Sequence, residues 1–250
     1  MTFVFLGIII LLVQLPLGWT AGYVLKTIGF ALCAAGFSEL REHCAQDNKN
    51  NKADPPVRES GLGGIAVWRA VSRLLSAEGA GGFRTSRLKA LDMLRKNAVT
   101  GMAAGIISAG AAAVFEFVSH SSAGNYVTSL CGAVMTFLAL RLAGGITAFL
   151  CEHDKLCREY RLTELLFCDT GTDLLRMKDL INKTGICMAV NLICDILNRV
   201  VPLESVQTYA GFMAFVSKLT LYVFVITAAV RTNAVRAGFY RRHPKQPEED

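Results

Sequence analysis

Long apolar runs separated by short polar or basic stretches dominate this chain. Four runs reach the roughly 20 helical residues that a hydrocarbon core about 30 Å thick requires. They are Ala98–Val118, Tyr126–Leu150, Thr184–Val201 and Tyr209–Val230, and none contains more than two charged residues. Strands do not fit these runs, because two-residue alternation is missing and lipid admits strands only in closed barrels. The pattern therefore predicts four transmembrane helices.

The N-terminal region holds two further apolar runs, Thr2–Leu17 and Tyr23–Leu40, separated by a glycine-rich break just after Pro16. One interpretation is a single helix over about residues 3–25 with an amphipathic tail. A second is a tight hairpin of two short helices. A third, a cleaved signal peptide, fits less well, because a basic leading segment and a clean cleavage site are missing. We favour the hairpin.

Basic residues are distributed unevenly between the apolar runs. Residues 41–97 hold 11 of the 26 Lys and Arg, residues 151–183 hold six and residues 231–250 hold five. The connections Ser119–Asn125 and Pro202–Thr208 hold none. Since cytoplasmic loops of membrane proteins are enriched in Lys and Arg, the three basic segments are expected in the cytoplasm and the two bare loops outside.

These observations predict an all-α fold, a polytopic membrane helix bundle of about six transmembrane helices with both termini in the cytoplasm. A transmembrane hairpin at 1–40 precedes a four-helix region at 98–230, which contains the cytoplasmic loop 151–183 and is followed by the basic tail 231–250. Between hairpin and bundle, the basic loop 41–97 is expected to carry one or two amphipathic helices. Their predicted ranges are Gly61–Glu78 and Arg84–Asn97, lying on the headgroup region or on the bundle.

Composition agrees with a membrane location. Of the 250 residues, 52% are hydrophobic and 18% are charged, whereas soluble domains carry about 25% charged residues. An ordinary soluble enzyme and a disordered chain are therefore excluded. The net charge of +6 follows from the cytoplasmic loops, which would face anionic lipid headgroups, and it does not indicate nucleic-acid binding. The expected location is a bacterial cytoplasmic membrane.

The fifth predicted span carries the polar pattern of greatest interest. Asn191, Asp195 and Asn198 are spaced by four and three residues, so they share one helix face. An acidic residue within a membrane normally faces the bundle interior and has a partner, for which Lys218 of the last span is the candidate. The four residues form either an intramembrane polar pathway or a structural ion pair with asparagines joining the helices.

Small residues also recur at helical spacing. Such stripes let helix backbones approach closely, and they fit a packed bundle and a homodimer equally well. They are Gly101, Gly105, Ser108 and Ala112 in the third span, and Gly29, Cys33 and Gly36 in the second.

Signatures of catalysis or of a cofactor site are missing from the sequence. Metalloprotease, serine-hydrolase, nucleotide-binding and dinucleotide-binding motifs do not occur. The stretch Cys151–Cys157 places His153 and Cys157 on one helix face, but a second pair of ligands is missing, so a zinc site is not expected. We expect no catalytic residue, no metal and no cofactor.

Residues Tyr23–Glu42 (YVLKTIGFALCAAGFSELRE) resemble a segment of small, uncharacterised polytopic membrane proteins of Firmicutes type. Phe83 with Arg84 and Arg87, and the run Leu174–Lys183, are also similar to that group. Lys26 departs from it, because a proline or an acidic residue is expected there. The resemblance implies a six-helix topology that begins with a hairpin, and no activity.

The sequence therefore leads to two functional hypotheses. The first is a non-enzymatic integral membrane protein with a structural, assembly or regulatory role, with lipid and either a second copy or another membrane protein as partners. The second is a small transporter or channel that uses Asn191, Asp195, Asn198 and Lys218.

Overall fold

The fold is entirely helical in the part of the chain that the computed structural model describes. These residues are 1–13, 19–50, 79–117, 122–159, 165–168, 171–201 and 203–243. Six helices and no strand occur within these ranges, which confirms the predicted fold class. They are α1 (Thr2–Leu12), α2 (Trp19–Asn50), α4 (Gly79–Phe117), α5 (Ser122–Glu159), α6 (Gly171–Val200) and α7 (Glu204–Arg242). All of them except α1 are long and apolar enough to cross a membrane.

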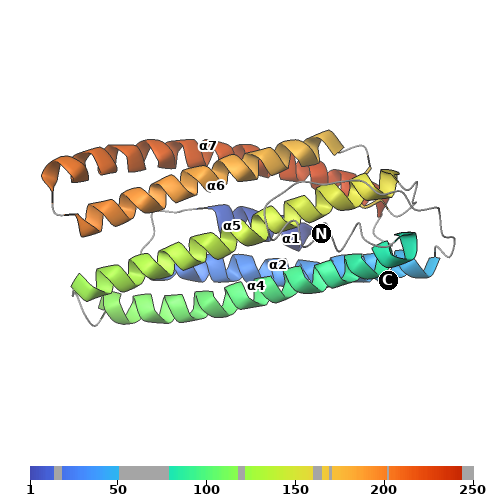
Figure 1. The fold of residues 1–250 in the computed structure, drawn as a ribbon, viewed down its shortest axis with the longest axis horizontal. Helices are drawn as coiled ribbons and strands as arrows, with labels where there is room; N and C mark the ends of the chain where they lie inside the picture. The colour runs from blue at the N-terminus through green and yellow to red at the C-terminus, as the bar shows by residue number, and fades with distance from the viewer. Residues whose placement is uncertain are drawn as a thin grey trace, which may run out of the picture.

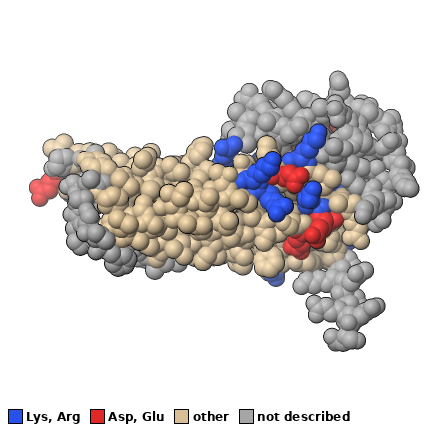
Figure 2. All heavy atoms as spheres, turned by 90° about the horizontal axis from the view of Figure 1, so that it is seen from below, with Lys and Arg blue, Asp and Glu red and all other residues tan. Residues whose placement is uncertain are grey.

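The helices lie nearly parallel in an elongated bundle (Figure 1). α2 packs against α4 on one side, α6 packs against α7 on the other, and α5 joins the two pairs. α1 lies in the middle, in contact with α2, α5 and α7. Lys and Arg side chains gather at one end of the bundle, whereas most of the remaining surface is uncharged (Figure 2). We call this end, which carries the exposed residues Arg41, Lys89, Arg95, Lys96, Arg158, Arg236, Arg241 and Arg242, the basic end.

The two N-terminal apolar runs form a helical hairpin, but its second helix, α2, is long and not one of the two short helices that the sequence predicts. α1 runs antiparallel to α2, and the amino group of Met1 forms an ion pair with Glu39 near the basic end. A helix of 11 residues is about 16 Å long, which is about half of the hydrocarbon thickness. α1 is therefore a short, partly buried helix. Among the described residues, five helices are candidates for complete membrane crossings, where the sequence predicts about six.

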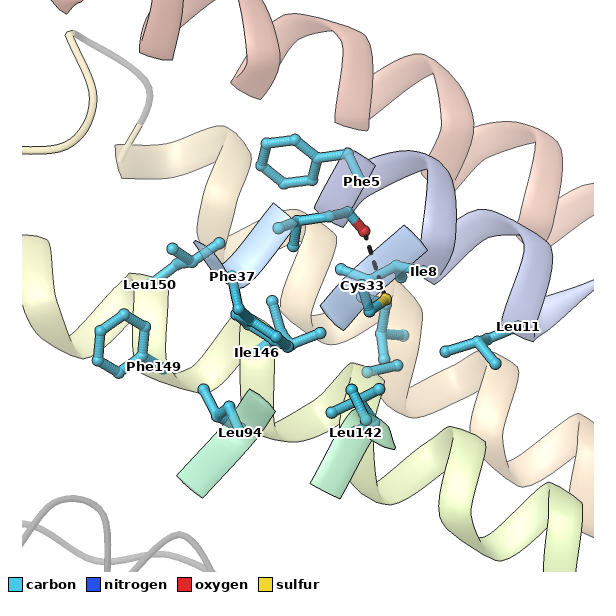
Figure 3. Close-up of a cluster of buried hydrophobic side chains, with 14 of the residues drawn as sticks. Phe5, Ile8, Leu11, Cys33, Phe37, Leu94, Leu142, Ile146, Phe149 and Leu150 are labelled. Atoms are coloured by element: carbon cyan, nitrogen blue, oxygen red, sulfur yellow. Dashed lines mark hydrogen bonds between the residues drawn. The ribbon is translucent and has the colours of Figure 1, made fainter. Parts of the chain in front are cut away.

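Small residues allow α1 and α2 to pack closely. A Cβ atom on Gly36 would lie 2.6 Å from the backbone nitrogen of Val4, and one on Gly7 would lie 2.7 Å from the carbonyl oxygen of Gly29. The Cys33 thiol donates to the carbonyl oxygen of Val4 at 3.8 Å. Apolar side chains from α1, α2, α4 and α5 surround this contact (Figure 3).

The small residues of α4 serve a second contact within the chain. A Cβ atom on Gly101 would overlap the ring of Phe30, and one on Gly105 would overlap the hydroxyl of Thr27. The sequence left open whether these small residues pack the bundle or form a homodimer. The glycines of α2 and α4 make close contacts within the bundle.

Several helices extend further toward the basic end than the apolar runs predict. α2 continues to Asn50, and α4 begins at Gly79, so that the predicted helix Arg84–Asn97 is its first part. The predicted amphipathic helix Gly61–Glu78 lies outside the described residues. At the opposite end, α7 already begins at Glu204, so the predicted loop Pro202–Thr208 is mostly helical. A change from apolar to polar side chains does not end a helix, because the backbone N–H and C=O groups can stay hydrogen-bonded to one another beyond that point.

The contact between α6 and α7 resembles an antiparallel coiled coil. Buried positions of α6 follow a spacing of three and four residues, which keeps one stripe facing the partner helix. They are Leu174, Met177, Ile181, Thr184, Met188 and Asn191. On α7 the corresponding stripe is Ala210, Ala214, Ser217, Leu221, Val225, Ala228, Thr232 and Val235. The packing of α6 against α7 thus determines which of the polar residues on α6 are buried.

Candidate functional site

The predicted polar residues of α6 lie along its contact with α7. Asn191 is 4% exposed and continues the buried stripe, whereas Asp195 and Asn198 are half-buried at its edge. Next to them, Cys194 packs with Ala210 and Ala214 of α7 in a small apolar cluster. The three residues therefore share one helix face, as their spacing predicts, and Asn191 is the most buried of them.

Lys218 of α7 is half-buried, but it does not form the predicted direct contact with Asp195. Within the described part of the chain, no ion pair joins these two side chains. Cys194, which precedes Asp195, packs with Ala210 and Ala214, and Lys218 lies one helical turn beyond Ala214 toward the basic end. The direct pair is not formed, and a polar pathway at these residues stays a prediction.

Another intramembrane cation, Lys26 of α2, is more deeply buried than Lys218. Its side chain is 9% exposed, and its ammonium group donates to the hydroxyl oxygen of Thr136 at 3.2 Å. The structure places no carboxylate of a described residue within ion-pair distance of Lys26. In the sequence, Lys26 is a single lysine within an apolar run, which is as strong a signal of an intramembrane site as Lys218.

The position of Lys26 follows from the packing of α1 on α2. Gly29, Cys33 and Gly36 form the face of α2 that contacts α1, and Lys26 is three residues before Gly29 on the same face. Leu11, near the end of α1, already contacts the position of Gly29. Lys26 therefore faces the middle of the bundle at the level where α1 ends, about 20 Å along α2 from Glu39.

Hydroxyl groups accompany Lys26 between α2 and α5. Tyr23 donates from its phenol to the carbonyl oxygen of Thr128 at 2.6 Å. Ser129 is 7% exposed, and its buried hydroxyl has no hydrogen-bond partner in the described structure. We call these five residues, Tyr23, Lys26, Thr128, Ser129 and Thr136, the α2–α5 polar patch.

A separate buried network holds the helices together at the basic end. Arg87 of α4 is fully buried and donates to His153 Nε2 at 3.1 Å and to the carbonyl oxygen of Cys44 at 2.7 Å. The Nδ1 atom of His153 lies 3.4 Å from Asp154 Oδ1, which also accepts from the backbone nitrogen of Leu166 at 3.0 Å. The network therefore connects α2, α4, α5 and the segment 165–168.

The chemistry of His153 is constrained by this network. Because a guanidinium group only donates, Nε2 must accept and Nδ1 must carry the proton that faces Asp154. The Cys157 sulfur lies 3.8 and 3.9 Å from the two ring nitrogens, so it lies beside the ring and is not aligned with one nitrogen. His153 and Cys157 are also fully buried. This geometry differs from a nucleophile–base pair.

Metal binding has no candidate among the described residues, where no group of three or more His, Cys, Asp or Glu side chains is arranged to hold an ion. The exposed surface of the basic end carries many cations instead. They include Arg41, Lys89, Arg95, Lys96, Arg158, Arg236, Arg241 and Arg242.

Fold and site together define a multi-pass integral membrane protein with a buried charge network at its basic end and isolated charges in its membrane region. The chain matches no model of a known protein family, no curated protein and no solved structure.

Proposed function

We propose that this chain is a non-enzymatic component of a bacterial cytoplasmic membrane, with a structural, assembly or regulatory role exerted at its basic, cytoplasmic end. One observation carries the proposal: the buried ionisable groups of this end, Arg87, His153 and Asp154, bind one another and the backbone of α2 and of the segment 165–168. They brace the end internally, and the neighbouring Cys157 thiol is fully buried with His153.

The exposed cations of the same end supply the interacting surface in this proposal. Lysine and arginine near a cytoplasmic membrane surface attract anionic headgroups, at about 1 kcal/mol for each residue. A braced helical end with a basic exterior suits contact with such lipids, and with a membrane protein partner or a second copy. A transporter or channel is the alternative, favoured by the intramembrane charges of Lys26, Asp195 and Lys218.

Complementation of a strain that lacks this protein separates the two functions. The first variant neutralises three exposed cations of α4 (Lys89→Gln, Arg95→Gln, Lys96→Gln), and the matched variant neutralises two half-buried intramembrane charges (Asp195→Asn, Lys218→Met). We expect the first to lose most of the rescue and the second to retain it, at equal membrane levels of protein. The opposite pattern would contradict the proposal and favour transport.

A further inference from the structure

We propose that Lys26, together with Thr136, forms the centre of a binding site for an oxyanion, a carboxylate or phosphate group, inside the membrane region. This proposal is independent of the structural role at the basic end, because the α2–α5 polar patch lies within the membrane-spanning part of the bundle.

Lys26 has more donors than the described residues satisfy. An ammonium group carries three N–H donors, and the structure records one hydrogen bond from Lys26, to the hydroxyl of Thr136. With 9% of its side chain exposed, Lys26 cannot direct the other donors freely into bulk water. Buried donors without acceptors are costly, so the site is prepared for a group that offers several acceptor oxygens.

The charge of Lys26 leads to the same ligand. The end of α1 contributes a partial negative charge of about half a unit at the level of Lys26, which favours a cation there without neutralising it. No described carboxylate forms an ion pair with Lys26. A bound oxyanion would supply the missing negative charge and the missing acceptors together.

The surroundings of Lys26 add polarity in an otherwise apolar region. Thr136 and Ser129 lie on the buried face of α5, two helical turns apart. The Ser129 hydroxyl is a further buried group without a partner in the described residues. Lys218, by contrast, is half-buried at the edge of α7, which makes it a matched intramembrane control.

Thermal unfolding of the full chain in an uncharged maltoside detergent tests the site, with three probes at constant ionic strength. Sodium acetate and sodium phosphate represent free solutes, and short-chain phosphatidylglycerol represents a lipid headgroup. We expect at least one probe to raise the melting temperature of the wild-type protein and of Lys218→Met by about 3 °C or more, which corresponds to a probe concentration of roughly ten times Kd or higher. Lys26→Met should shift by less than about 1 °C.

The pattern among probes identifies the source of the anion. A response to acetate or phosphate indicates a solute site, and a response to phosphatidylglycerol alone indicates a lipid site. Thr136→Val removes the hydroxyl that binds the ammonium group of Lys26 and should weaken the response, which keeps the test informative if Lys26→Met folds poorly. An equal response in all variants, or no response in wild-type protein to any probe, would overturn the proposal.

Discussion

An Arg87→Ala variant is expected to lose about 3 kcal/mol of unfolding free energy, because removing one partner of a buried charged network leaves the others without their hydrogen bonds. Arg87 is fully buried, and its loss would leave His153 Nε2 and the carbonyl oxygen of Cys44 without their present donor. We expect a fall of several degrees in the apparent melting temperature of the detergent-solubilised protein.

The control for this prediction is Arg95→Ala, since Arg95 lies on the same helix but is exposed. Surface substitutions usually change stability by less than about 0.5 kcal/mol. If both variants melted like the wild-type protein, the buried network would not hold α2, α4 and α5 together.

Gly36→Ala is expected to have the second large effect, because it separates α1 from α2. The new Cβ atom would lie 2.6 Å from the backbone nitrogen of Val4, and a backbone cannot yield as a flexible side chain can. Overpacking of this kind typically costs about 1–3 kcal/mol. Since α1 is short and covers Cys33, the thiol of Cys33 should then react faster with N-ethylmaleimide, as measured by peptide mass spectrometry.

Gly22→Ala is the matched control on the same helix. No atom lies within 4 Å of the Cβ position of Gly22, and alanine is the better helix former by about 1 kcal/mol. This variant should be as stable as the wild-type protein or slightly more so, with Cys33 still protected. Equal protection of Cys33 in both variants would show that α1 does not depend on the close contact at Gly36.

The sequence predicted the elements of the fold well, because bilayer thickness and backbone pairing leave few alternatives to a helix for each long apolar run. The break after Pro16 likewise predicted the hairpin that α1 and α2 form. The small residues of α2 and α4 were also identified, since they recur at helical spacing. Their partners, such as Phe30 opposite Gly101, depend on which helices become neighbours, and the sequence contains no direct signal for that choice.

The buried network at the basic end could not be predicted in the same way. Arg87 belongs to a segment with many exposed cations, so the sequence does not distinguish it from Lys89 or Arg95. Its burial arises from His153, 66 residues further along the chain. Lys26 is different, because a single lysine within an apolar run is itself a signal. The same signal that marks Lys218 could therefore have marked Lys26 as a buried intramembrane cation.

The intramembrane polar residues of α6 and α7 illustrate the limit of helical spacing. The spacing placed Asn191, Asp195 and Asn198 on one face, and the structure agrees that the face lies along α7. The direct partnership of Asp195 and Lys218 required in addition that the long lysine side chain turn toward the carboxylate. That choice of side-chain conformation is not determined by spacing along two helices.

The most direct test of this account is a double-mutant cycle on thermal stability with Asp195→Asn and Lys218→Met. Close packing at small residues and the Arg87 network stabilise the bundle, whereas Asp195 and Lys218 do not stabilise it as an ion pair. We therefore expect additive effects, with a coupling energy below about 0.5 kcal/mol. Coupling of about 2 kcal/mol, with the double variant recovering the stability lost by Asp195→Asn alone, would contradict this account.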